Sequence, residues 1–479
     1  MTPPTNDNDN QYHIIIFFSV HPFRYGSQAR RVLLISFIII QGKVNIYLKN
    51  QYNLLFLNKK AKNFLPNRCF FHMQPERLHD RLRKRLGRLP AAFLTGQRTL
   101  KNSVSILLLA LGLCTLPLAV QAASVQLASH IVDQYAEHIF YNSGATGMAL
   151  VVVDGDQVVN RSFGDTSPGN HQRPRSDSLI RIASITKLMT SEMMVKLAAE
   201  GRVKLTDPLR NYAPKGAYVP TYNSRQPITL LNLATHTSTL PREQPGKKPP
   251  KTPVFTWPTM AQRWHWLAHS NITMPPGVRA SYSNLAYDLL ADALSRAAGK
   301  SYSALLKERI TVPLGMIDTT LTPSAEQCSR LMVAALGSSA CRNTTAAGGS
   351  GGIYSTPHDI QRWMQQFLSS TPVGSRKSTA ASEQTMYFQR QDLVSLQGMD
   401  VPGRAGALGL GWVYLAPKDG LPGIIEKTGG GGGFMTYMAM IPQKNLGVFA
   451  VVTRSALSKF TNMSDPVNRL LGELAANKH

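Results

Sequence analysis

Ser184 and Lys187 stand three positions apart in the apolar run RIASITKLMT, residues 181–190. A serine hydroxyl is a weak nucleophile and needs a base beside it. On a helix, residues at i and i+3 share a face, so Lys187 can reach Ser184, and the helix N-terminus adds positive potential near the serine. A Ser-x-x-Lys match arises about once or twice by chance in a chain of this length. The pair alone is therefore equally compatible with a solvated helix lysine.

Two further motifs follow Ser-x-x-Lys in the chain. Tyr282-Ser283-Asn284 stands just before a predicted helix, and Lys427-Thr428-Gly429 leads into a predicted strand. Each motif is weak by itself. All three in this order, each in a suitable local setting, are hard to obtain by accident and predict a serine acyl-transfer site.

With these motifs the chain resembles the penicillin-recognising serine enzymes, in the class C β-lactamase-like branch that has Tyr-x-Asn where other branches have Ser-x-Asn. The resemblance covers most of residues 125–475 and includes ITLLNLATHTSTLP (228–241) and GSGGIYSTPHDIQRWMQQFL (349–368). Within that branch, the phrases REQPG, LGLGWVYLAPK and KTGGGGGFMTYMAMIPQKN are most similar to D-alanyl-D-alanine carboxypeptidases and endopeptidases with weak β-lactamase activity. The resemblance implies an α+β fold, the serine β-lactamase/DD-peptidase fold, with an α/β sandwich plus a helical region.

The resemblance gives catalytic roles to Ser184, Lys187, Tyr282 and Lys427. Ser184 would attack the carbonyl carbon of a D-Ala-D-Ala peptide or a β-lactam and form an acyl-enzyme. Burial and the positive charge of Lys427 would lower the pKa of Lys187, and two neighbouring ammonium groups would favour the phenolate of Tyr282. The sequence leaves open which of Lys187 and Tyr282 is the acylation base.

Substrate-binding roles are implied for Asn284, Thr428, Gly429 and Gly430. The Asn284 amide would hold the peptide carbonyl of the substrate and orient the lysine, and Thr428 would help to bind the terminal carboxylate. The oxyanion hole would consist of the backbone N–H groups of Ser184 and Gly430, and the loss of one such donor costs about 3 kcal/mol.

Strand patterns stand at both ends of this region, and helical patterns fill its middle. Residues 147–165 predict two strands joined by a turn at Asp154-Gly155, and residues 408–453 contain the runs WVYLA, FMTYMAMI and LGVFAVVT. The expected helices span residues 126–139, 184–200, 229–236, 284–298, 303–310 and 465–476, with one more that begins at 355–357. This order predicts an antiparallel sheet built from both chain ends with an inserted all-helical part, and a site at their boundary.

The first 122 residues differ from the rest. Residues 103–120 form an apolar run preceded by basic residues and followed by a small-residue exit, which predicts a signal peptide over 103–122 with cleavage after Ala122. A retained membrane anchor is the alternative. Residues 1–102 are expected to be a disordered leader or extension, with the true start at Met73 or later, and residues 123–479 to be the catalytic domain.

The formal net charge is +25, but about half of this excess precedes residue 103. In the remainder, Lys and Arg are dispersed without a basic stripe interleaved with aromatic residues, so no nucleic-acid partner is expected. Attraction to an acidic envelope polymer or lipid surface stays open. Cys328 and Cys341 are expected to form a disulfide that stabilises an exported chain by about 3 kcal/mol, with two buried thiols as the alternative.

Other candidate sites are weaker. His265 and His269 have the i, i+4 spacing of a zinc pair, but Trp266 stands where a metalloprotease needs glutamate, so no metal is expected. The GGSGG run (348–352) lacks the Lys-Ser/Thr ending of a phosphate loop, and no cofactor is predicted. His236 is interpreted as a locally hydrogen-bonded residue at a helix end, without a catalytic role.

The preferred function is a periplasmic serine DD-carboxypeptidase and DD-endopeptidase with peptidoglycan muropeptides and β-lactams as substrates. Peripheral association with the inner membrane is left open, and the sequence makes no statement on oligomeric state. The alternatives are a class C-type β-lactamase, a promiscuous esterase that uses the same Ser, Lys and Tyr, and a non-catalytic penicillin-binding or cell-wall-sensing module. The two hydrolases share their acylation machinery and differ in how water reaches the acyl-enzyme, which motifs do not determine.

Overall fold

The computed structural model describes residues 12–25, 28–41, 129–368, 380–399 and 403–478. The chain divides into two units, Met1–Leu108 and Leu109–His479, which are described separately. The predicted signal peptide, its cleavage position at Ala122 and the alternative start at Met73 lie outside the described residues.

The described residues of the first unit form one hairpin. β1 (Tyr12–Tyr25) pairs antiparallel with β2 (Gln28–Gln41) in an unbroken register. The wider expectation of a disordered leader over residues 1–102 stays a prediction. Both runs are rich in Ile, Val and Phe, which favour strands, and they flank a short Gly-Ser connection.

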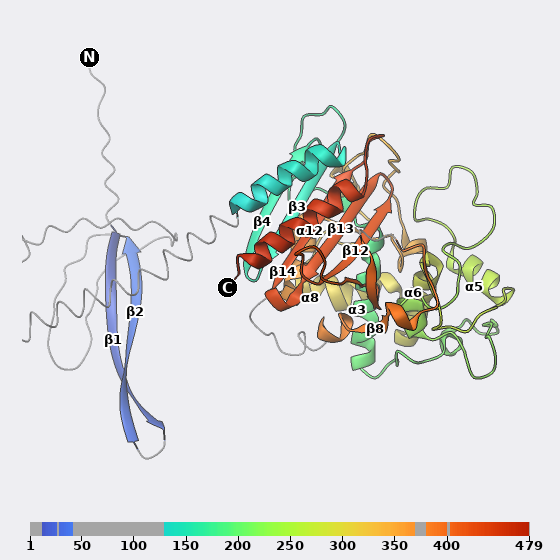
Figure 1. Cartoon of the computed structure of the whole chain (residues 1–479), viewed down its shortest axis with the longest axis horizontal. Coiled ribbons are helices and arrows are strands. Elements are labelled where there is room, and N and C mark those ends of the chain that lie inside the picture. Colours follow the sequence, from blue (N-terminus) through green and yellow to red (C-terminus); the bar gives the residue numbers. More distant parts are fainter. Residues whose placement is uncertain (1–11, 26–27, 42–128, 369–379, 400–402, 479) are drawn as a thin grey trace, which may run out of the picture. The chain divides into compact units, whose positions relative to one another are not determined.

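The second unit is built around one antiparallel sheet of eight strands in the order β4-β3-β14-β13-β12-β11-β10-β8 (Figure 1). The N-terminal hairpin β3–β4 joins the C-terminal strands where β3 pairs with β14. The sheet is therefore assembled from both ends of the unit, as predicted. Its strands are β3 (Gly147–Asp154), β4 (Gln157–Gly164), β8 (Met386–Gln389), β10 (Ala405–Gly409), β11 (Val413–Leu415), β12 (Ile424–Gly431), β13 (Phe434–Ile441) and β14 (Leu446–Thr453).

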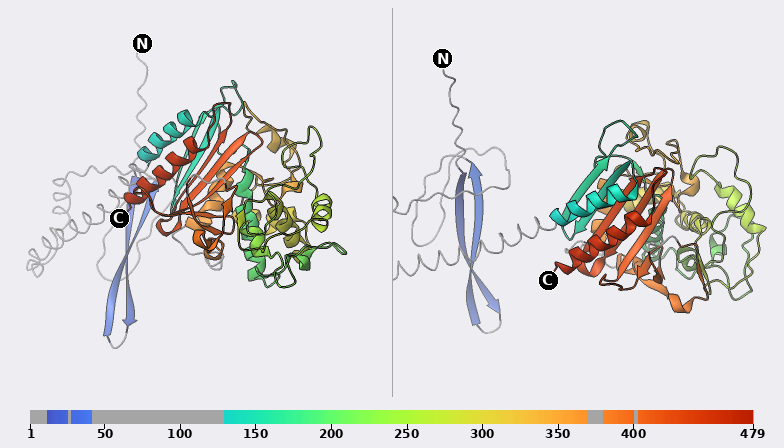
Figure 2. Two further views of the ribbon diagram at one scale, coloured as in Figure 1. Left: turned by 45° about the vertical axis from the view of Figure 1, so that its right-hand side comes forward. Right: turned by 45° about the horizontal axis from the view of Figure 1, so that its top comes forward.

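Both faces of the sheet are covered. On the outer face, the helix of residues 129–143 and α12 (Thr461–Ala476) lie side by side across the strands (Figure 2). On the inner face, the sheet packs against the helical part. The sheet thus separates two hydrophobic cores, and alternate residues of β3 pack into one or the other. Leu150 packs into the core under the outer helices, and Val151 packs into the core that the sheet shares with the helical part.

The helical part lies between β4 and β8 in the chain. The described helices are α3 (Thr186–Ala199), α4 (Leu230–Ala234), α5 (Met260–Ala268), α6 (Asn284–Ala298), α7 (Tyr302–Leu306), α8 (Val312–Leu314), α9 (Ala325–Ser329) and α10 (Pro357–Leu368). Two short strand pairs accompany them: β5 (Ile180–Arg181) with β7 (Tyr354–Ser355), antiparallel, and β6 (Ala280–Ser281) with β9 (Leu396–Gln397), parallel.

Helix boundaries follow their caps. Ser283 accepts a hydrogen bond from the N–H of Ala286 at 2.9 Å and starts α6, and Gly299 ends it at a φ of +65°. Five expected helices differ from the structure in their bounds. The one over 126–139 extends to residue 143, and the one over 465–476 begins at Thr461. The one predicted from residue 184 begins as α-helix only at Thr186, the one over 229–236 is shorter, and the one over 303–310 changes to a π-helical turn after Leu306.

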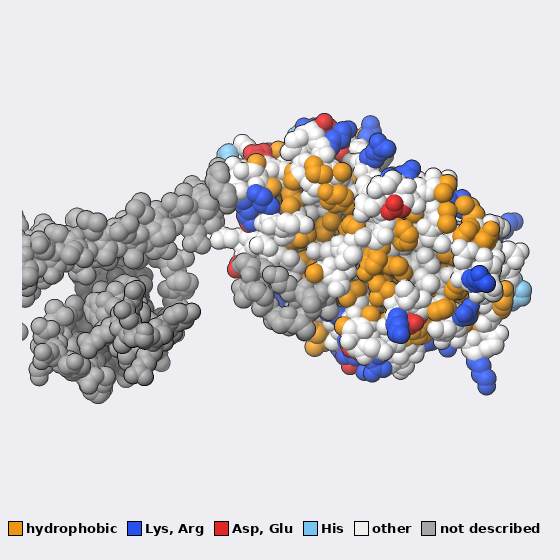
Figure 3. All heavy atoms as spheres, turned by 60° about the horizontal axis from the view of Figure 1, so that its bottom comes forward, with side chains coloured by type: hydrophobic (Ala, Val, Ile, Leu, Met, Phe, Trp, Pro, Cys, Tyr) orange, Lys and Arg blue, Asp and Glu red, His pale blue; other side chains and the backbone are white. Residues whose placement is uncertain are grey.

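Lys and Arg side chains are dispersed over the face shown in Figure 3, among apolar and neutral residues. Within the described part of the chain, no helix is both long enough and apolar enough to cross a membrane.

Candidate active site

Ser184 lies in a tight turn between a strand and a helix. β5 ends at Arg181, a 3₁₀ turn spans Ala183–Ile185, and α3 follows at once. Ala183 has a φ of +46°, a left-handed conformation that is costly for a residue with a Cβ. The strained turn places Ser184 just before the first residue of α3, at the positive end of this helix.

Lys187 is fully buried in the first turn of α3. Its Nζ lies 3.2 Å from Ser184 Oγ, and it donates to Asn284 Oδ1 and to the carbonyl oxygen of Ser350, both at 2.6 Å. Burial lowers the pKa of this amine and Lys427 lowers it further, while Tyr282 acts in the opposite direction. The amine is thus beside the hydroxyl and is shifted toward the neutral form that a base requires.

Tyr282 lies between two ammonium groups. The Nζ atoms of Lys187 and Lys427 are each 4.9 Å from the centre of its ring. Burial alone would raise the pKa of the phenol, but the two lysines, together with hydrogen bonds to Ser184 and Lys187, lower it to about 8. A phenolate is therefore accessible near neutral pH, within hydrogen-bonding reach of the nucleophile.

Asn284 is the first residue of α6 and connects the lysine to a further carboxylate. Its Oδ1 accepts from Lys187, and its Nδ2 donates to Glu243 Oε1 in a short hydrogen bond. The Glu243 contact fixes which end of the amide faces the lysine. Sequence reasoning missed Glu243, although it belongs to the REQPG phrase that carried the resemblance.

Lys427, Thr428 and Gly429 lie within β12, where they pair with Met438, Tyr437 and Thr436 of β13. The motif leads into the predicted strand, since β13 begins at Phe434, but its three residues are themselves part of β12, a strand that was not predicted. At Gly429 the strand runs against the serine turn. A Cβ at Gly429 would come within 2.2 Å of Thr436 Oγ1 and 3.1 Å of the Ser184 nitrogen. Glycine is required here for close approach.

Ser350 and Asp288 form a hydrogen-bonded chain that supports Lys187. The carbonyl of Ser350 accepts from Lys187, while the N–H and Oγ of Ser350 bond to the two carboxylate oxygens of Asp288, at 2.9 and 3.1 Å. Burial raises the pKa of the Asp288 carboxyl to about 7. Neither residue was predicted as part of the site, although Ser350 belongs to the phrase of residues 349–368 that carried the resemblance.

His236 belongs to the site, contrary to the interpretation from sequence. It is buried, its ring stacks on that of Tyr282 at a centroid distance of 4.4 Å, and its Nδ1 accepts from the N–H of Ser283 at 3.1 Å. Its side-chain hydrogen bond is thus made to a residue 47 positions away and is not local.

The remaining candidates lie elsewhere. His265 and His269 are exposed on and just after α5, with His269 Nδ1 2.8 Å from the carbonyl of His265. No group of three or more His, Cys, Asp or Glu residues that could hold a metal ion occurs in the part of the chain that the structure describes. Cys328 and Cys341 form the expected disulfide. Arg181 Nη2 donates to the carbonyls of Ser339 and Ala340, which ties the disulfide loop to β5 just before the serine turn.

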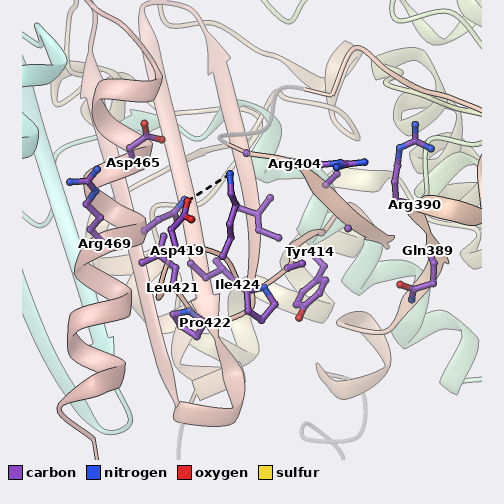
Figure 4. A pocket seen from close by; sticks show the side chains of 18 of the residues that line it. Gln389, Arg390, Arg404, Tyr414, Asp419, Leu421, Pro422, Ile424, Asp465 and Arg469 are labelled. Atoms are coloured by element: carbon purple, nitrogen blue, oxygen red, sulfur yellow. Dashed lines mark ion pairs between the residues drawn. The ribbon is translucent and has the colours of Figure 1, made fainter.

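A separate groove of about 1210 Å³ opens between α12 and the β10–β12 edge of the sheet (Figure 4). Arg390 and Arg404 line one side of it, and Asp465 and Arg469 of α12 line the other. Of the described residues that line this groove, none belongs to the candidate active site. The acyl-transfer groups converge on the inner face of the sheet.

Comparison with known proteins agrees with this geometry. A family model described as Beta-lactamase matches residues 129–472. The chain belongs to the beta-lactamase family. Within this family, it is 62% identical over 374 residues to the D-alanyl-D-alanine-carboxypeptidase/endopeptidase AmpH of Escherichia coli strain K12, covering 78% of this chain and 96% of that protein.

Solved structures of this beta-lactamase family give the same result. A beta-lactamase/D-alanine carboxypeptidase from Yersinia pestis, complexed with citrate, has 70% sequence identity and a TM-score of 0.70, covering 73% of this chain and 99% of that one. A class C beta-lactamase from Rhodobacter sphaeroides has 20% identity and a TM-score of 0.58, over 72% of this chain and all of that one, and supports the fold alone. The resemblance and the fold predicted from the motifs are thus confirmed.

Proposed function

We propose that this chain is a serine D-alanyl-D-alanine carboxypeptidase and endopeptidase that trims and cuts peptidoglycan peptides in the periplasm, with weak β-lactamase activity. The observation that carries the acyl-transfer chemistry is the 3.2 Å contact between Ser184 Oγ and the buried amine of Lys187, next to the Tyr282 phenol. The choice of substrate is supported by the relatives from E. coli and Y. pestis, whose names both include D-alanine carboxypeptidase activity.

Acylation begins with attack of Ser184 Oγ on the carbonyl carbon of the penultimate D-alanine. The hydroxyl proton passes to Lys187 or Tyr282, both of which contact Ser184. A C–O bond forms, and the carbonyl electron pair moves to oxygen. The backbone N–H groups of Ser184 and Gly430 are the proposed donors to this oxyanion.

Collapse of the tetrahedral intermediate breaks the C–N bond. The departing amine takes a proton from the Tyr282 hydroxyl, which is the proposed general acid because two ammonium groups let the phenolate form. Water then attacks the acyl-enzyme by the reverse proton path and releases the shortened peptide. A β-lactam enters the same cycle, except that its amine stays tethered to the acyl group.

Recognition of the substrate uses the charge of β12. Lys427 and Thr428 carry the positive charge and hydroxyl that suit the terminal carboxylate of a D-Ala peptide or a penicillin. Asn284 Nδ2 is the proposed donor to the peptide carbonyl and is already directed by Glu243. A pure binding module would have no need for a nucleophile and a buried amine in contact, which disfavours the non-catalytic alternative.

Labelling with a fluorescent penicillin tests the acyl-enzyme. The wild-type protein is expected to form a covalent adduct at Ser184, and Ser184→Ala is expected to form none while its melting temperature stays close to that of the wild type. Ser295→Ala is the matched control, because its hydroxyl donates to the carbonyl of Ala291 within α6. Labelling of Ser184→Ala, or no adduct in the wild type, would reject the mechanism.

Mass spectrometry of muropeptides tests the substrate. Loss of terminal D-alanine supports the carboxypeptidase, and release of monomers from cross-linked dimers supports the endopeptidase. If neither product forms and nitrocefin is hydrolysed rapidly, the chain is a β-lactamase instead. Export is tested by N-terminal sequencing of the protein from the periplasmic fraction, where a mature start at Ala123 is expected.

A further inference from the structure

We propose that His236 is a positioning residue of the acylation step, which holds the Tyr282 phenol between Lys187 and Lys427. This inference rests on the proposed function and adds to it a residue that does not contact the substrate. It follows from how His236 holds both the ring of Tyr282 and the backbone on each side of it.

The backbone and the side chain of His236 bind the two neighbours of Tyr282. The His236 carbonyl accepts from the N–H of Ser281 at 2.8 Å, and its Nδ1 accepts from the N–H of Ser283 at 3.1 Å. The N–H of Tyr282 itself donates to the carbonyl of Gln397 at 3.0 Å. The three N–H groups of the Tyr282 segment are thereby fixed, so little freedom remains in the direction of its side chain.

The imidazole ring also fixes the phenol ring. The two planes are 26° apart with centroids 4.4 Å apart, a stacked contact, and Tyr287 of α6 lies against the imidazole at 5.1 Å. The hydroxyl of Tyr287 donates to the carbonyl of Ala234 at 2.6 Å, which holds that ring in turn. His236 is therefore clamped by Tyr287 and is rigid enough to orient Tyr282.

The protonation state of His236 follows from its contacts. Since Nδ1 accepts a backbone N–H, the neutral ring carries its proton on Nε2. Burial lowers the pKa of this ring well below the usual value, and Lys427, Lys187 and Arg242 lower it further. Among the described residues Nε2 has no hydrogen-bond partner. The histidine therefore adds no charge to a site that already holds several cations.

The charged groups around the phenol come from three elements. Lys187 is on α3, Lys427 is on β12, and the guanidinium of Arg242 in the segment after α4 lies 4.7 Å from the centre of the Tyr282 ring. Glu243 is directed to Asn284. A phenol that moves away from the two lysines loses their stabilisation of its phenolate, so its titration reports its position.

Two substitutions separate the ring contact from the hydrogen bond. His236→Asn keeps an acceptor at the same number of bonds from Cα and suits the φ of +60°, but removes the ring. His236→Phe keeps a ring and removes the acceptor. Both are expected to lower the rate of acylation by a fluorescent penicillin by about tenfold to a hundredfold, the loss typical of a displaced catalytic group. In His236→Asn the pKa that defines the acidic limb of the pH–rate profile is expected to rise toward the ordinary tyrosine pKa of about 10.

The control for a purely structural role is the same substitution in a Tyr282→Phe background. If His236 acts through the phenol, His236→Asn has little further effect on the acylation rate there. His269→Asn, at an exposed histidine, is the matched surface control and is expected to behave as the wild type. Melting temperatures of all variants identify any that fail to fold, and His236→Phe then carries the test.

Three results would overturn the inference. The first is that both His236 variants have the acylation rate and the pH–rate profile of the wild type. The second is that His236→Asn lowers the rate but leaves the acidic limb of the profile where it is in the wild type. The third is that His236→Asn lowers the rate in the Tyr282→Phe background by the same factor as in the wild-type background. All three require that the wild type is labelled at Ser184, and therefore leave the proposed function intact. An unlabelled wild-type protein would reject the proposed function and this inference together.

Discussion

Gly429 is the position where β12 lies against the serine turn, and Gly429→Ala is expected to impair acylation more than folding. The added Cβ would lie 2.2 Å from Thr436 Oγ1, 2.9 Å from the Ile182 carbonyl oxygen and 3.1 Å from the Ser184 nitrogen. Ordinary contacts begin near 3.4 Å. The strand must therefore move about 1 Å from the turn, or Thr436 must rotate and give up its 3.0 Å hydrogen bond to Ile182.

The size of both effects follows from this displacement. Strain from an added methyl group in a packed site costs about 1–3 kcal/mol, and the lost hydrogen bond about 1 kcal/mol more. In a domain of this size that lowers the melting temperature by about 5 °C. A shift of about 1 Å at a catalytic site costs roughly a hundredfold in rate, equivalent to about 2.7 kcal/mol.

The assay is the rate of covalent labelling by a fluorescent penicillin, with thermal unfolding measured on the same samples. Gly430→Ala is the stability control, since the nearest atom to its Cβ would be Phe434 O at 3.9 Å. Its melting temperature should match that of the wild type. Adding Thr436→Ala to Gly429→Ala removes the closest contact and should restore part of the acylation rate. A wild-type labelling rate in Gly429→Ala would refute the reasoning.

Other predictions concern groups at and beyond the serine turn. If the Tyr282 phenolate is the acylation base, the acylation rate should rise with pH and level off above about pH 8, because the pKa of Tyr282 is lowered to about 8. Tyr282→Phe should abolish this limb in a pH–rate measurement. Arg263→Leu should destabilise the protein by about 3–5 kcal/mol in denaturant unfolding, since it leaves the buried Asp292 carboxylate without its bidentate partner. Reduction of Cys328–Cys341 should lower stability by about 3 kcal/mol in thermal unfolding, while Cys328→Ser should make the protein insensitive to reductant.

The sheet could be predicted from sequence because its signals are local. Continuous apolar runs mark β3, β13 and β14, and the turn at Asp154-Gly155 separates β3 from β4. The order of strands, helices and strands implies how they join. β8, β10 and β12 were not predicted. β8 and β10 have four and five residues, which is too short to establish a pattern of period two. They become strands because neighbours in the sheet supply the pairing.

The site could be predicted only where residue types form a motif. Ser184 and Lys187 are close in sequence, and Tyr282 and Lys427 belong to spacings that the family shares. His236 shows why the rest could not be found. Its φ of +60° and its hydrogen bond to Ser283 depend on how the segment after α4 packs beside α6. An isolated histidine carries no sign of that contact. The interpretation placed His236 correctly at a helix end, but its side-chain hydrogen bond to Ser283 is not local.

The motifs identify the reacting groups, but the packing around these groups determines their pKa values. Burial lowers the pKa of Lys187 and raises that of Asp288 to about 7, while two ammonium groups bring Tyr282 to about 8. Groups that would otherwise titrate over about six pH units are thereby drawn toward neutrality. Of these groups, Lys187 and Tyr282 contact Ser184 and can accept its proton. These shifts exist only while β12 and α6 press against the serine turn. Gly429 sets how closely β12 approaches it, and His236 sets where the phenol lies, so both act on the same proton transfer without taking part in it.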